Sequence, residues 1–269
     1  MSNQIEKMHM ETGHENSKID AGWQEARQNE VIKRLDSGDN IQEIMEDFPE
    51  FKEAFKALDT IDCSDGRVLK GRKMGIAGSG LLLSEAERET FISRFKGQIK
   101  TITTHADCGA AALKFNSLKQ EEIPEGVTTA DEYGTYCGKK LAEDLGAKHE
   151  YLEREEMAND YHNETAIVID QTGEFDSTNL KGFPNHFVCT GAGLGFSEDY
   201  MKTEVRTLAG IALGHHGFGD RFNSDNPFRI IIAAKDRDEL RRWINIGEAA
   251  VEEYVGRVKV TGFIAPEKE

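Results

Sequence analysis

Between residues 57 and 255 the sequence switches repeatedly between short apolar segments and longer amphipathic ones. The short segments have the length of buried strands, and the longer ones repeat apolar residues at helical spacing. Alternation of this kind favours a parallel sheet, because a crossover between parallel strands needs a connection long enough for a helix. We therefore predict an α/β fold with a mainly parallel β-sheet flanked by helices, and we detect no internal repeat. The predicted strands are 57–62, 73–77, 99–104, 148–152, 166–170 and 229–233, and the predicted helices of this region are 84–95, 110–118, 130–145 and 236–255.

The start of the chain differs from the rest. Residues 1–22 are polar and carry no apolar period, so we expect an N-terminal arm that is flexible or docks elsewhere. A helical pattern begins at residue 23, and no later stretch has a composition that forces a domain boundary. We therefore expect residues 23–269 to form a single α/β domain.

The chain is strongly acidic, with 33 basic and 49 acidic residues and a formal net charge of −16. This balance argues against a general affinity for nucleic acid or anionic membranes, because like charges repel. The longest apolar runs, at residues 80–83, 166–169 and 230–234, are far shorter than the roughly 18 residues of a membrane-spanning helix. The first residues lack the apolar core of a signal peptide. We expect a cytoplasmic protein with no nucleic-acid or membrane partner.

Two segments carry residues that are suited to chemistry: CSDGR at 63–67 and HADC at 105–108. Each follows a predicted strand, and the carboxyl ends of parallel strands are where open α/β sheets place their sites. In a reducing compartment a cysteine is more often a buried hydrophobic residue, a metal ligand or a nucleophile than half of a disulfide. The two segments are therefore candidates for one shared site. The alternative is that the cysteines are separate core residues and the histidine is a hydrogen-bonded core residue.

Cys63, His105 and Cys108 would supply two thiolates and one imidazole. This donor set suits zinc and leaves the fourth tetrahedral position open, which is typical of catalytic rather than structural zinc sites. We therefore predict one zinc ion per chain. Arg67, two residues after Asp65, can keep that carboxylate ionised and oriented, so that one oxygen accepts a hydrogen bond from a metal-bound water.

The two motifs, in this order, resemble the paired signature of the β-class carbonic anhydrases. The matching segments are CSDGRV at 63–68 and THADCGAA at 104–111, and the AIVIDQTGEFD stretch at 166–176 is similar to the strand–turn–strand that follows the second motif in that family. The resemblance covers about residues 25–176. Gly66 stands where the family usually has Ser or Ala, and residues 177–269 have no counterpart, so we interpret them as an extension of the domain.

The resemblance implies a β-carbonic anhydrase-like fold and a zinc lyase. Cys63, His105 and Cys108 would bind the zinc, and Asp65 and Arg67 would form the catalytic dyad. The reaction would be the reversible hydration of CO2 to bicarbonate and a proton by zinc-bound hydroxide. The resemblance also implies a homodimer or a higher homo-oligomer.

Two other functions stay open on the sequence. The same zinc site could serve a hydrolase of carbon disulfide or carbonyl sulfide. Alternatively, the chain could be a non-catalytic zinc-holding binding or regulatory module, in which residues 177–269 block the site or recognise a partner. The intact Asp65 and Arg67 favour catalysis, since a structural site does not require them.

Outside the two motifs, the adjacent His215 and His216 lie in a glycine-rich segment that could cover the site, move protons or bind a second ion. The simpler interpretation is a surface loop. Cys137 and Cys189 are predicted to be core residues.

Overall fold

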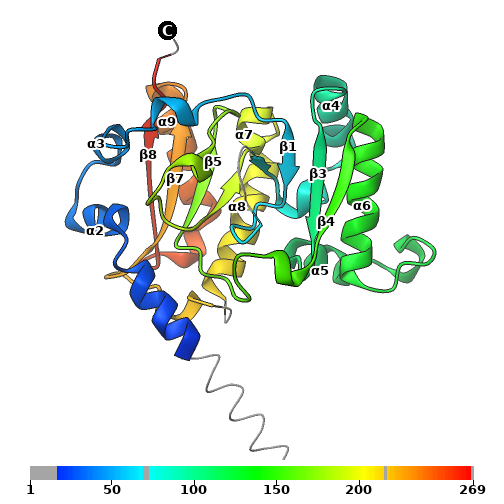
Figure 1. Cartoon of the computed structure of the whole chain (residues 1–269), viewed down its shortest axis with the longest axis horizontal. Coiled ribbons are helices and arrows are strands. Elements are labelled where there is room, and N and C mark those ends of the chain that lie inside the picture. The colour runs from blue at the N-terminus through cyan, green and yellow to red at the C-terminus, as the bar shows by residue number, and fades with distance from the viewer. Residues whose placement is uncertain (1–16, 69–72, 215–216, 268–269) are drawn as a thin grey trace, which may run out of the picture.

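The computed structural model describes residues 17–68, 73–214 and 217–267 (Figure 1). In this part of the chain the strands form two four-stranded sheets, and every neighbouring pair within each sheet is parallel. Helices flank both sheets. The predicted α/β fold with a parallel sheet is thus confirmed, but with two sheets rather than one.

The first sheet has the strand order β2-β1-β3-β4 and carries both sequence motifs. Helix α6 packs on β3 and β4 through Leu141, Ala142 and Leu145, which are buried. Thr129 caps its N-terminus in a capping box with Glu132. The elements of this unit are β1(Thr60–Asp62), β2(Lys73–Gly75), α4(Glu85–Phe95), β3(Thr101–His105), α5(Gly109–Ser117), α6(Ala130–Leu145) and β4(Lys148–Leu152).

The second sheet has the order β6-β5-β7-β8. Both of its faces are covered, which explains why β7 is buried along its whole length. Helices α8 and α9 pack on one face, and α2 and α3 contribute to an apolar cluster with residues of β5, β7 and β8 on the other. The elements of this unit are α2(Glu30–Ser37), α3(Ile41–Glu46), β5(Ala166–Asp170), β6(His186–Cys189), α7(Gly191–Leu194), α8(Glu198–Leu213), β7(Phe228–Ala234), α9(Arg237–Ala250) and β8(Val258–Ile264).

Short 3-10 turns complete the connections in the described ranges: η1(Lys52–Ala54), η2(Ala77–Gly80), η3(Gln120–Glu122), η4(Arg154–Glu156), η5(Ser177–Asn179), η6(Gly219–Arg221) and η7(Glu252–Tyr254).

The N-terminal arm predicted for residues 1–22 is only partly within the described residues, because residues 1–16 lie outside them. Residues 17–26 are helical, so the first helix begins before the predicted residue 23. Its Trp23 ring packs edge-on against Phe218 and Phe222, with centroids 5.2 Å apart in each pair. The helix that contains the end of the arm is thus docked on the second sheet unit.

The two sheets repeat one strand order, although the sequence shows no repeat. In each, the second strand of the unit is at one edge, followed by the first, the third and the fourth. The edges β2 and β6 lie beside each other: the backbone N–H of Thr190 donates to the carbonyl of Gly75 at 2.8 Å, and that of Val188 donates to Ser64 at 2.9 Å. The two units therefore meet edge to edge (Figure 1).

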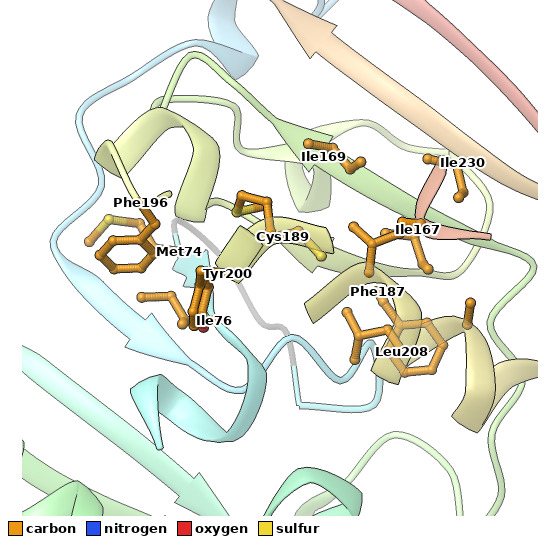
Figure 2. Packing of buried hydrophobic residues seen from close by; sticks show 14 of the residues in the cluster. Met74, Ile76, Ile167, Ile169, Phe187, Cys189, Phe196, Tyr200, Leu208 and Ile230 are labelled. Atoms are coloured by element: carbon orange, nitrogen blue, oxygen red, sulfur yellow. The ribbon is translucent and has the colours of Figure 1, made fainter. Parts of the chain in front are cut away.

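One apolar cluster crosses this junction. Figure 2 shows Met74 and Ile76, from β2 and the residue after it, packed with Phe196 and Tyr200 near the start of α8, while Phe187 of β6 packs with Leu208. Burial of this shared apolar surface stabilises the contact between the units.

None of the helices in the described ranges is long and apolar enough to cross a membrane.

Candidate metal centre

Neighbouring parallel strands bring the two sequence motifs together, as the sequence predicts. β1 pairs with β3 in the register Ile61 with Ile102, so the residues beyond both strands lie at the same edge of the sheet. Cys63 follows β1 directly, and His105 is the last residue of β3. Cys63 and His105 therefore approach each other although a long stretch of chain separates them.

Cys108 reaches the same point because the chain turns sharply after β3. Asp107 has a φ of 54°, in the left-handed region that Asp tolerates better than most residues. Its backbone N–H donates to Asp131 Oδ1 at 3.1 Å, which holds the turn. The turn leads into α5 with Cys108 as the N-cap residue.

The three predicted ligands form a buried group. The Sγ atoms of Cys63 and Cys108 are 3.8 Å apart, and the ligand atoms of all three residues lie within 4.8 Å of one another. His105 Nδ1 donates to the carbonyl of Ala106 at 2.8 Å, which fixes the ring. His105 Nε2 is buried and has no hydrogen-bond partner in the described part of the chain. A buried imidazole nitrogen without a partner, beside two thiols, is what a metal ligand presents in the metal-free state.

The spacing of the sulfur atoms fits zinc. Two thiolates on one tetrahedral zinc ion, with Zn–S bonds of about 2.3 Å, are about 3.8 Å apart, which equals the observed 3.8 Å between Cys63 and Cys108. Two thiolates and one imidazole are also the donors that zinc favours over Mg²⁺ or Ca²⁺. The group can hold a metal ion, and its chemistry suits zinc.

The ligands differ in how readily they lose their protons without a metal. The hydrogen bond from the Cys108 thiol lowers the pKa of Cys63 well below its ordinary value, although burial opposes this. The same hydrogen bond, together with burial, raises the pKa of Cys108. Burial lowers the pKa of His105, but the neighbouring Cys63 thiolate outweighs this and raises it to about 9. Of the two thiols, Cys63 is therefore the one that ionises more readily.

Asp65 and Arg67 form a closed ion pair beside the three ligands. Arg67 Nη2 lies 2.6 Å from Asp65 Oδ2, and Arg67 Nε lies 3.0 Å from Oδ1. The backbone N–H of Arg67 also donates to Oδ1 at 3.0 Å, so the turn itself orients the carboxylate. Burial favours a higher pKa for Asp65, but Arg67 holds it below its ordinary value. Asp65 Oδ2 lies 4.0 Å from His105 Nε2, which places the ionised carboxylate next to the candidate metal position.

The sequence did not indicate two further residues at this site, His162 and Glu164. His162 Nδ1 lies 3.2 Å from Glu164 Oε2, and these groups lie within 4.8 Å of the Asp65 carboxylate. Burial raises the pKa of Glu164, and the Glu164 carboxylate raises that of His162 although burial opposes this. No motif marks either residue, since both lie in the connection between β4 and β5.

The other predicted candidates fall away from the centre or outside the described part. His215 and His216 lie outside the described residues. Cys189 is buried in the apolar cluster that crosses both sheets, as predicted. Cys137, in α6, is half-buried rather than a core residue, so that prediction was wrong, and its thiol is free.

Comparisons with known proteins assign no family to this chain. No family model, no curated protein and no solved structure matched the chain. What is shown is a buried Cys/His/Cys triad that could hold a metal ion, within an α/β structure of parallel sheets.

Proposed function

We propose that this chain is a zinc-dependent carbonic anhydrase that interconverts CO2 and bicarbonate. One observation carries the proposal: the buried ligands Cys63, His105 and Cys108 converge beside an ion pair of Asp65 and Arg67. A purely structural metal site would need the three ligands but not the ion pair of Asp65 and Arg67. The similarity of both motifs to the β-class signature supports the same function.

Cys63, His105 and Cys108 would hold the zinc ion, which would supply Lewis-acid activation of a water at the position that these three residues leave open. The role of the protein is to arrange what surrounds that position. Asp65 stays ionised and accepts hydrogen bonds, and Arg67 holds the carboxylate in place through its guanidinium group and its backbone N–H. The Arg67 guanidinium also supplies positive charge where an anionic product forms.

Stopped-flow CO2 hydration between pH 7 and 9 tests the proposal, on protein whose zinc content has been measured. We expect turnover that rises with pH, and that is lost when a chelator removes the metal. Absence of turnover with a full equivalent of zinc bound would contradict the proposal. Assays with carbon disulfide and carbonyl sulfide on the same sample would then separate a sulfur-substrate hydrolase from a non-catalytic zinc-holding module.

A homodimer or higher homo-oligomer is part of the proposal. The β2 edge of the first sheet already lies beside β6 of the same chain, since Gly75 exchanges hydrogen bonds with Thr190. A second copy would therefore have to bind through another surface. Light scattering at several protein concentrations measures the assembly.

A further inference from the structure

Glu204 is a fully buried carboxylate that neither motif contains. It lies in α8 of the second sheet unit and is 0% exposed. Burying an ionisable side chain lowers the stability of a protein unless the group makes hydrogen bonds in its buried position. Burial raises the pKa of Glu204 to about 7. The residue is therefore a poor choice for filling a core, and its contacts explain its presence better.

A single oxygen of Glu204 ties together the two segments that surround Cys63. Glu204 Oε1 accepts from the backbone N–H of Ala77 at 2.5 Å and from Ser64 Oγ at 3.3 Å. Ser64 is the residue after Cys63. Ala77 is the residue before Gly78, whose backbone N–H donates to Cys63 Sγ at 3.3 Å.

These contacts act on the Cys63 sulfur from two sides. The contact of Glu204 with Ser64 fixes the backbone next to Cys63. Its contact with Ala77 fixes the segment in which the Gly78 N–H donates to Cys63 Sγ. Tyr200, one turn earlier in α8, donates to the same Glu204 oxygen at 3.4 Å and so holds the carboxylate in place. Within the described residues the contacts of Glu204 with Ser64, Ala77 and Tyr200 are all made by Oε1, and the Cys189 thiol lies close to the same carboxylate.

We propose that Glu204 is a positioning residue for the metal centre: it holds the Cys63 thiolate and the Gly78 N–H in register with His105 and Cys108. The second sheet unit then completes the centre from within the same chain. This inference rests on the metal site of the proposed function, but not on CO2 being the substrate.

The test compares three variants of Glu204 in the full-length protein. Glu204→Gln keeps an acceptor oxygen at the Oε1 position, Glu204→Asp withdraws the carboxylate by one methylene, and Glu204→Leu removes the acceptor. Zinc affinity is measured by competition with a chelator, and the thiolate-to-metal charge-transfer band is recorded on the cobalt-substituted protein. Losing a group that orients a ligand costs about 10- to 100-fold in metal affinity. We expect a loss in that range and a changed cobalt band for the Asp and Leu variants, and recovery of both in the Gln variant.

Two matched controls separate positioning from general stability. Val205→Ala makes a cavity in the same helix, at a residue that is 0% exposed and apolar, and should lower the melting temperature without weakening zinc binding. Tyr200→Phe removes one donor to Glu204 but leaves the contacts with Ser64 and Ala77, and should have a smaller effect than the Asp variant. If Glu204→Leu fails to fold, the comparison of Glu204→Asp with Glu204→Gln still tests the proposal.

Wild-type zinc affinity in the Asp variant would overturn the inference. So would a loss of affinity in Val205→Ala equal to that in the Asp variant at a matched melting temperature. Because metal affinity is measured without turnover, a wild-type protein that binds zinc but does not hydrate CO2 would contradict the proposed function and leave this test intact.

Discussion

The backbone carbonyl oxygen of His186 lies only 2.4 Å from where a Cβ atom on Gly66 would be. The Glu164 Cγ atom is 2.9 Å from the same point. Gly66 does not have the positive φ that favours glycine, so the requirement comes from space alone. The edge of the second sheet therefore lies directly against the loop that carries Asp65 and Arg67. This close approach explains why a glycine stands at position 66.

Gly66→Ala should destabilise the protein. The nearest obstacle is backbone, which cannot rotate away, and overpacking of this kind costs about 1–3 kcal/mol. Urea unfolding measures the change in the free energy of unfolding. The control is Gly210→Ala in α8, where the nearest atom to a Cβ is Tyr254 Oη at 3.5 Å. That substitution should be neutral or stabilising by up to about 1 kcal/mol. Equal effects at both positions would show that the contact with His186 is unimportant.

Cys108→Ser should lose most of the bound zinc together with activity, because the thiolate is one of three protein ligands. Cys137→Ser removes a half-buried thiol outside the triad and should retain a full equivalent of metal. Metal analysis after dialysis against a weak chelator compares the two. Full zinc occupancy in the Cys108 variant would exclude it as a ligand.

Asp65→Asn should keep the metal and lose most turnover, by roughly 100-fold or more, because the neutral amide is a weaker hydrogen-bond acceptor beside the reacting group. The same substitution at Asp144, whose carboxylate pairs with Arg88 at 2.7 Å on the surface, should change little. Steady-state kinetics and metal content are measured together. Loss of zinc in the Asp65 variant would instead indicate that Asp65 is a ligand.

His186 should make folding stability depend on pH. Burial lowers its pKa to about 4, and its neutral ring donates from Nδ1 to Pro184 and accepts from Ser177 at Nε2, both at 2.6 Å. An unfolded histidine has a pKa of about 6.5. Between these values the unfolded chain binds the extra proton, so this contribution is complete above pH 6.5 and is lost as the pH falls towards 4.

The lost contribution amounts to at most about 3 kcal/mol. The measurement is the difference in unfolding free energy between the wild type and His186→Gln at pH 7.5 and at lower pH. Other buried acids, such as Asp170, whose pKa burial raises to about 6, titrate in both proteins and cancel in the difference. A difference that stays constant with pH would contradict the prediction.

The sequence was sufficient to predict that Cys63, His105 and Cys108 lie together, because their placement follows from local rules. Strand ends of a parallel sheet share an edge, and Cys63 and His105 each follow or end a strand. The helical spacing of apolar residues in α8 was also present in the sequence, although we did not predict that helix. The strands β6 and β8 were missed as well: β6 has only four residues, and the seven residues of β8 are mostly half-buried and include Gly262.

The residues that surround the ligands could not be found in this way. Glu164 and Glu204 reach the site through the packing of one sheet against another, and no spacing in the chain encodes that approach. The repeated strand order was invisible for a related reason. Strand order depends on how the connections cross, and two units can share it without sharing residues.

The edge-to-edge meeting of the two sheets also fixes when the centre can form. All three candidate ligands lie between residues 63 and 108, and the contact from Ser64 to Glu204 spans 140 residues. During translation the three candidate ligands are synthesised well before β6 and α8, which hold the Cys63 segment in place. Contacts of such long separation form late in folding. In the newborn chain both motifs are therefore made before the second sheet unit, and the support that Glu204 gives to the Cys63 segment can form only after α8 has been synthesised.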